Sequence, residues 1–122
     1  MSLLNPTPGE VIDRISIVEL KIRAFERTGK DPYSFKDECA ALEVYLAARG
    51  PWLPSIDKLS HELSEINKLL WCCEDEVRTS EKAVELSITA KRIARLNDER
   101  NRLIRAINSE YGLEPGEEKI YS

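Results

Sequence analysis

The stretch Thr7–Phe25, TPGEVIDRISIVELKIRAF, decides the fold class because it predicts one long helix with apolar residues on nearly every side. Its main apolar face consists of Val11, Ile15, Val18, Ile22 and Phe25, which recur at helical spacing. A second apolar stripe, formed by Ile17, Leu20 and Ala24, also contains Asp13. A helix that is apolar on two faces is expected to lie between other helices. We therefore expect Asp13, and with it Glu19, to meet other helices rather than water.

A carboxylate in such a position needs a partner from another part of the chain. Burying an ionised group without a partner costs several kcal/mol, roughly, in real proteins. The sequence offers three arginines for this purpose, Arg78, Arg100 and Arg105. We therefore expect an interior polar cluster of carboxylates and guanidinium groups.

The rest of the chain is also predicted to be helical, because it contains no alternating apolar and polar run of useful length. Thr7, Pro8 and Glu10 form the pattern of a capping box at a helix start. Breaks at Thr28-Gly29, Asp31-Pro32 and Gly50-Pro51 separate the elements that follow. The expected helices cover about residues 8–27, 34–49, 55–78 and 80–111, and a tail covers 112–122. With 122 residues the chain fits a single domain, an antiparallel all-α bundle of about four helices.

The tract from Ser55 to Tyr111 has neither glycine nor proline, so it forms either one very long helix or a helical hairpin. A 3-4 apolar seam runs without interruption through its first part, at Ile56, Leu59, Leu63, Ile66, Leu70, Cys73 and Val77. A second seam, out of phase with the first, consists of Leu86, Ala90, Ile93, Ile104, Ile107 and Tyr111. Thr79 and Ser80 are available between them as N-caps. Residues 60–81 are mainly acidic and residues 82–105 mainly basic, which favours a hairpin whose arms attract each other.

Polar residues occupy positions in this tract that face the interior. Asn97 and Arg100 take two positions of the second seam. On the first arm Asn67, Trp71, Glu74, Arg78 and Glu81 form a stripe beside the apolar seam. The predicted ligand-binding set is Asp13, Glu19, Lys21, Trp71, Glu74, Arg78, Asn97, Arg100, Arg105 and Asn108. No catalytic residue is assigned.

Composition excludes several classes of function. The net charge is −4, from 18 basic and 22 acidic residues, which argues against nucleic acid as the main partner. No apolar run reaches the roughly 20 residues that span a bilayer, and the N-terminus lacks the parts of a signal peptide. We therefore expect a cytoplasmic protein that does not bind membranes. Cys39, Cys72 and Cys73 are interpreted as free thiols, and with a single histidine, His61, we expect neither a metal site nor a cofactor.

Four blocks of the sequence carry a resemblance to a known family. In chain order they are GEVIDRISIVELKI, NKLLWCCEDEVRTSE, ARLNDERNRLIRAIN and EEKIY. Together they resemble a small all-helical family of bacteria and phages that is classed as a domain of unknown function. The resemblance implies a role for polar residues of all four blocks, namely Glu10, Asp13, Glu19, Lys21, Trp71, Glu74, Asp75, Arg78, Asn97, Asp98, Arg100, Arg105, Asn108, Glu118, Lys119 and Tyr121. It implies no activity, and Cys72-Cys73 depart from its pattern, in which an aliphatic residue is usual.

Three hypotheses for function follow. In the first, a small anion such as a phosphate or sugar phosphate binds the interior cluster, since guanidinium forks fit such oxyanions. In the second, the domain is a structural or adaptor module whose buried ion network sets helix register. In the third, it is an enzyme similar to the all-helical chorismate mutases, to whose opening helix IDRISIVELKIRAF is loosely similar. The two apolar faces of the first helix favour a homodimer.

Overall fold

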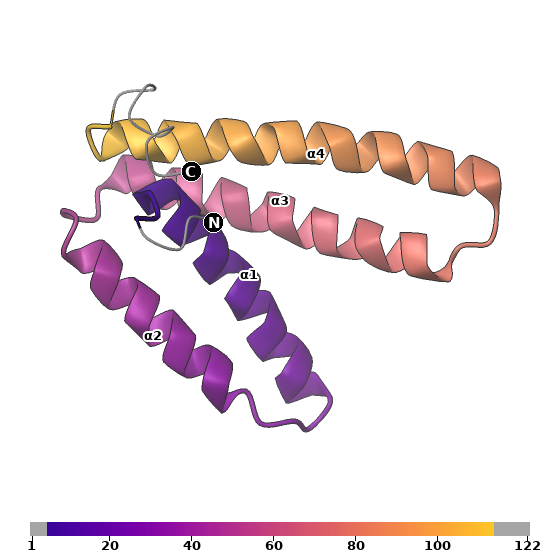
Figure 1. The fold of residues 1–122 in the computed structure, drawn as a ribbon, viewed down its shortest axis with the longest axis horizontal. Coiled ribbons are helices and arrows are strands. Elements are labelled where there is room, and N and C mark those ends of the chain that lie inside the picture. Colours follow the sequence, from indigo (N-terminus) through magenta and orange to yellow (C-terminus); the bar gives the residue numbers. More distant parts are fainter. Residues whose placement is uncertain (1–4, 114–122) are drawn as a thin grey trace.

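Four helices make up the fold in the computed structural model, which describes residues 5–113 (Figure 1). They are α1 (Pro8–Arg27), α2 (Tyr33–Ala47), α3 (Pro54–Thr79) and α4 (Ala83–Glu110). Within residues 5–113 there is no β-strand, and the predicted all-α helical bundle is confirmed. The predicted tail, from position 114 onward, and the EEKIY block lie outside the described residues.

The helix ends follow local chemistry, with small corrections to the predicted boundaries. The capping box is present, because the Thr7 side chain accepts a hydrogen bond from the Glu10 N–H and Glu10 accepts one from the Thr7 N–H. Gly112, at φ 83°, lies two residues beyond the end of α4 at Glu110, directly after the C-cap residue Tyr111, where a glycine is favoured. Thr79 and Ser80 are not N-caps: α3 continues through Thr79, and α4 begins only at Ala83. The backbone at Ser80 and Lys82 is extended, and this makes the turn between the two helices.

The helices form two hairpins that meet at one end, as Figure 1 shows. The α3–α4 hairpin is the longer one. The first half of α1 lies against the end of this hairpin where α3 begins and α4 finishes, while its second half leads away together with α2. Within the described residues, the backbone of α2 packs against that of α1 alone, whereas α1 packs against all three other helices.

The apolar core lies where the two hairpins meet. Its buried side chains come from all four helices and are Val11, Ile12, Leu46, Ile56, Leu63, Leu103 and Ile107. The predicted seam of α3 is confirmed for Ile56, Leu63, Leu70 and Cys73, all buried, but Val77 is 44% exposed near the hairpin turn.

The predicted seam of α4 needs a correction. Ala90 is exposed, whereas Thr89 and Leu103 are buried. The face of α4 that meets α3 is therefore rotated from the predicted one. Thr89 tolerates this position because its hydroxyl donates to Glu76 of α3, at 3.2 Å between Oγ1 and Oε2.

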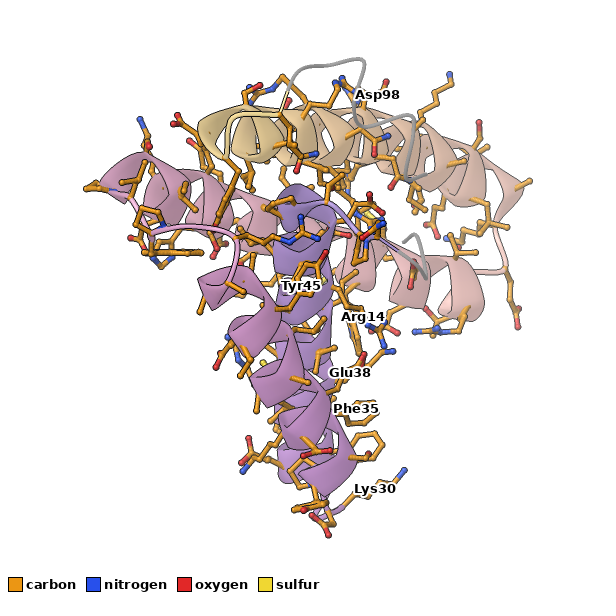
Figure 2. All side chains as sticks on the ribbon, turned by 60° about the vertical axis from the view of Figure 1, so that its left-hand side comes forward. Arg14, Lys30, Phe35, Glu38, Tyr45 and Asp98 are labelled. Carbon is orange, nitrogen blue, oxygen red and sulfur yellow. The ribbon has the colours of Figure 1, made fainter. Side chains whose placement is uncertain are left out.

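The α1–α2 hairpin is held by contacts along its length (Figure 2). Arg14 and Glu38 point toward each other, and the Arg14 Nε donates to Glu38 Oε1 over 2.8 Å. Farther along, the rings of Phe25 and Phe35 pack edge to face with centroids 4.9 Å apart. At the other end the Tyr45 hydroxyl donates to the carbonyl of Pro6, at 2.9 Å. Within residues 5–113, no helix is both long and apolar enough to span a membrane.

Candidate functional site

The candidate site is the place where α1 crosses the α3–α4 hairpin, and Gly9 sets how closely the helices approach. A Cβ atom on Gly9 would lie 2.4 Å from the carbonyl oxygen of Ile104 in α4, far inside van der Waals contact. The Gly9 N–H donates to Oδ1 of Asn108, at 2.7 Å. Only glycine fits this contact, so the first turn of α1 is seated directly on the backbone of α4.

Asp13 lies one turn farther along α1 and is the charged centre of the site. Its side chain is 9% exposed, and that of Arg100 from α4 is 30% exposed. Arg100 donates from Nε to Oδ1 over 2.8 Å and from Nη2 to Oδ2 over 2.5 Å. This is the two-pronged pairing by which a guanidinium holds a carboxylate most firmly. The expected partnership between Asp13 and Arg100 is present.

Asn67 and Ser16 complete the group of polar side chains around Asp13. The buried Asn67 of α3 donates from Nδ2 to Oδ1 of Asp13 at 2.9 Å and to Oγ of Ser16 at 2.6 Å. The Ser16 hydroxyl donates to the main-chain carbonyl of Asp13 at 2.7 Å. We call these four residues, Asp13, Ser16, Asn67 and Arg100, the crossing network. It joins α1, α3 and α4 through side chains alone.

The electrostatic environment of the crossing network keeps Arg100 charged beside Asp13. The pKa of Arg100 is raised, first by its hydrogen bonds to Asp13, against the opposing effect of burial, and then by the attraction of Asp13 and of Glu74. Among residues 5–113, no buried side-chain nitrogen or oxygen lacks a hydrogen-bond partner. The network therefore satisfies its own polar groups, as buried groups must.

The structure separates the three arginines that the sequence places in one cluster. Arg78 is exposed in the last turn of α3, where it pairs with Asp75. Arg100 lies 17 residues beyond the start of α4 at Ala83, which is roughly 25 Å along the helix axis from the hairpin turn. Arg105 is exposed, and five residues place it about 140° round α4 from Arg100. Only Arg100 contacts Asp13, so a cluster of the three guanidinium groups is not assembled.

The other predicted site residues lie at or outside the edge of the crossing network. Of the polar stripe on α3, Asn67 is buried, Trp71 is half-buried, and Glu74, Arg78 and Glu81 are exposed. Glu19 is half-exposed near Arg23, and Lys21 lies over the ring of Phe35. Asn97 is half-buried, and Asn108 is buried against Gly9. The hydrogen-bonded group that α3 contributes is the neutral Asn67, whereas the exposed Glu74 acts on Arg100 by charge attraction.

Sequence reasoning missed Gly9 and Ser16. They share one face of α1 with Asp13, at positions i−4 and i+3 from it. A small residue on each side of a charged one, on the same face of an apolar helix, indicates a close helix crossing. The stronger apolar pattern of α1 lies on its main apolar face, to which neither residue belongs.

A groove lies on another side of α1. It has a volume of about 620 Å³ and runs between α1 and α2 toward the start of α3. Its walls are mostly apolar, including Ile12, Ile15, Leu46 and Trp52, with Tyr111 at one end. Burial raises the pKa of Tyr111, so its hydroxyl stays protonated at neutral pH.

Thiol and metal chemistry find little support in the geometry. The pKa of Cys39 is raised by burial and then by Glu43, Glu19 and Glu38, which keeps the thiol protonated and a weak nucleophile. Cys73 is buried, and the exposed His61 contacts Asp57 at 3.5 Å. Within residues 5–113, no three His, Cys, Asp or Glu side chains gather in an arrangement that could hold a metal ion. Comparison with protein-family models, curated proteins and solved structures gives no match to this chain.

Proposed function

We propose that this chain is a structural or adaptor domain whose crossing network fixes the register between two helical hairpins. The observation that carries the proposal is the pairing of Asp13. Both Arg100 nitrogens of the fork, together with Asn67, donate to this one buried carboxylate. A buried ion pair of this kind adds little net stability, but every helix arrangement that leaves one of its charges buried and unpaired is strongly destabilised.

The competing proposal, a small anion bound at the interior arginines, has less support. An anion at this place would compete with Asp13 for the Arg100 fork, and Arg78 and Arg105 are exposed elsewhere on the molecule. Asp13 already supplies the negative charge that such a ligand would bring. The geometry therefore favours an internal ion pair over a ligand pocket.

The decisive experiment replaces Arg100 and compares the loss of stability with that caused by replacing an exposed arginine elsewhere on the molecule. Arg100→Met leaves Asp13 buried with only the neutral donor Asn67, and we expect it to lower the free energy of unfolding by about 3 kcal/mol. Arg23→Met is the control, because Arg23 is exposed and pairs with Glu19 of its own helix. We expect the control to change stability by less than about 0.5 kcal/mol. Chemical denaturation monitored by circular dichroism measures both.

Two further measurements separate the register device from the anion site. The double variant Asp13→Asn/Arg100→Met carries no buried charge, so it should regain most of the lost stability. Phosphate, sulfate and sugar nucleotides should leave the melting temperature of the wild type unchanged. A rise in melting temperature that disappears in Arg100→Met would instead support anion binding and refute the register proposal.

A further inference from the structure

The side of the α3–α4 hairpin that faces away from α1 has an ordered pattern of charge. Glu62, Glu65, Leu69, Cys72 and Glu76 follow a heptad stripe along α3, and all five are exposed. Leu69 lies two residues, or about 200°, from the buried Asn67, so this stripe points away from α1. It is acidic, with one large apolar side chain, Leu69, at its centre.

The neighbouring stripe on α4 is basic. It consists of Ile88, Arg92, Arg95, Glu99 and Arg102. Glu99 is the single acidic residue among the five and is half-buried, whereas the other four are exposed. Glu99 is neutralised within the helix by Arg102. We call the two stripes together the two-stripe face.

Contacts across the hairpin show that the two stripes lie side by side. Arg92 and Glu76 approach to 4.0 Å near the turn. At the other end, the pKa of Arg102 is raised mainly by its hydrogen bonds to Glu99, and the nearby Glu62 adds to the effect. Glu62 is therefore level with Arg102, and Glu76 is level with Arg92.

The two-stripe face also exposes apolar side chains. Leu69 is 51% exposed and Ile88 is 55% exposed. Ile88 stands beside a groove of about 500 Å³ at the hairpin turn, which is also lined by Thr79, Ser80 and Arg92. Protein–protein interfaces combine an apolar centre with a polar rim, and on this face Leu69 and Ile88 would supply the apolar part.

We propose that the two-stripe face binds a second copy of this chain, with α3 of each subunit lying on α4 of the other. This inference rests on the proposed adaptor function, and it identifies the partner of the adaptor as a second copy of the same chain. Two stripes of opposite charge make a face complementary to itself, which a two-fold symmetric dimer requires.

The charges also decide the direction of the symmetry axis. A two-fold axis perpendicular to the helices, in the plane of the interface, would place α3 of one subunit on α3 of the other and bring acidic residues together. An axis parallel to the hairpin keeps each residue at its level, so that Glu62 faces the partner's Arg102 and Glu76 faces the partner's Arg92. Both hairpin turns then lie at the same end of a four-helix assembly, with Leu69 and Ile88 near the axis.

The size of the face predicts a dimer of modest strength. From Glu62 to Glu76 the stripe extends over 14 residues, or roughly 21 Å. Two helices of this length give an interface at the low end of the stable range, about 1,200 Å² in total. We expect a dimer at tens of micromolar protein and low salt, and a shift toward monomer at about 1 M salt, where the Debye length is about 3 Å.

Sedimentation equilibrium on the full chain tests the proposal. Ile88→Glu should weaken the dimer at least tenfold, whereas Val44→Glu should not, because Val44 is 72% exposed on α2, away from this face. Glu76→Arg and Arg92→Glu should each weaken it, and the two together should restore it, because they exchange the charges of a facing pair. Circular dichroism confirms that each variant is folded.

Two results would overturn the proposal. One is a monomeric wild type at tens of micromolar and low salt, and the other is a dimer that Ile88→Glu and both charge reversals leave unchanged. Either result leaves the crossing network untouched, because that network lies within one subunit. Conversely, a small effect of Arg100→Met on the free energy of unfolding would contradict the register proposal. A dimer that is weakened by Ile88→Glu could still be observed in that case.

Discussion

At the scale of single residues, the charged pair of the crossing network depends on the small side chains beside it. Asp13 reaches Arg100 and Asn67 only because Gly9 allows α1 to lie on the backbone of α4. Ser16 fills the space beyond Asp13 and gives Asn67 a second acceptor. A bulkier side chain at either position would separate the helices and strand the carboxylate.

Gly9→Ala tests this dependence. The added methyl would lie 2.4 Å from the Ile104 carbonyl and 2.9 Å from Oδ1 of Asn108, so the helices must separate or rotate. We expect a loss of about 1–3 kcal/mol in the free energy of unfolding, although alanine is the better helix former. Denaturant titration provides the measurement.

Ser55→Ala is the matched control for Gly9→Ala. Ser55 is the second residue of α3, as Gly9 is of α1, but it is exposed. The control should change stability by less than about 0.5 kcal/mol. If Gly9→Ala were equally neutral, the close contact with α4 would not hold the crossing.

At the scale of elements, the four helices differ in how much tertiary structure supports them. Within the described residues, the backbone of α1 packs against α2, α3 and α4, whereas that of α2 packs against α1 alone, and α2 has a single buried side chain, Leu46, in the core. Most helical stability in proteins comes from packing of an apolar face rather than from intrinsic propensity. α2 is therefore the least supported helix of the described chain.

Hydrogen exchange should detect this difference. Amides of α2 should exchange by local opening, well before those of the first half of α3, where Ile56 and Leu63 are buried. Mass spectrometry of peptic fragments measures the order. Protection of α2 equal to that of α3 would mean that the two hairpins unfold as one unit.

Much of this element structure could be predicted from the sequence, because its signals are local. The capping box at Thr7, the glycine after α4 and the phase change that divides α3 from α4 each depend on a few neighbouring residues. That Asp13 pairs with one of three arginines could also be predicted, since a charge in an apolar helix needs a partner of opposite sign, but the choice of Arg100 among them could not.

The rest of the site depends on tertiary geometry that helical periodicity does not contain. Periodicity gives the face of a residue but not the point where another helix crosses it. Arg78 and Arg100 both follow interior-facing patterns, yet α1 reaches only the end of the hairpin where Arg100 lies. The rotation of α4 that buries Thr89 in place of Ala90 is likewise fixed by packing against α3.

At the scale of the whole molecule, we expect the crossing network to restrict the angle between the two hairpins, which meet at the apolar core. Figure 1 shows them diverging from one end. Apolar contacts there would permit several neighbouring arrangements, whereas a forked ion pair permits few. The network is therefore expected to fix one shape more than to add stability.

Small-angle scattering separates these two roles. Asp13→Asn/Arg100→Met should be nearly as stable as the wild type, yet its distance distribution should broaden as the hairpins sample a range of angles. The measurement belongs at about 1 M salt, where charge-dependent association is screened. An unchanged profile would show that apolar packing alone sets the angle.

The crossing network also has a consequence for how the chain folds during synthesis. Asp13 is made before its partners, since Asn67 follows 54 residues later and Arg100 follows 87 residues later. At ribosomal rates this delay is about 4–17 s, far longer than a helix needs to form. During that time Asp13 lacks both partners from the α3–α4 hairpin, so its carboxylate has to stay hydrated, and α1 can be buried against the hairpin only after Arg100 has been made.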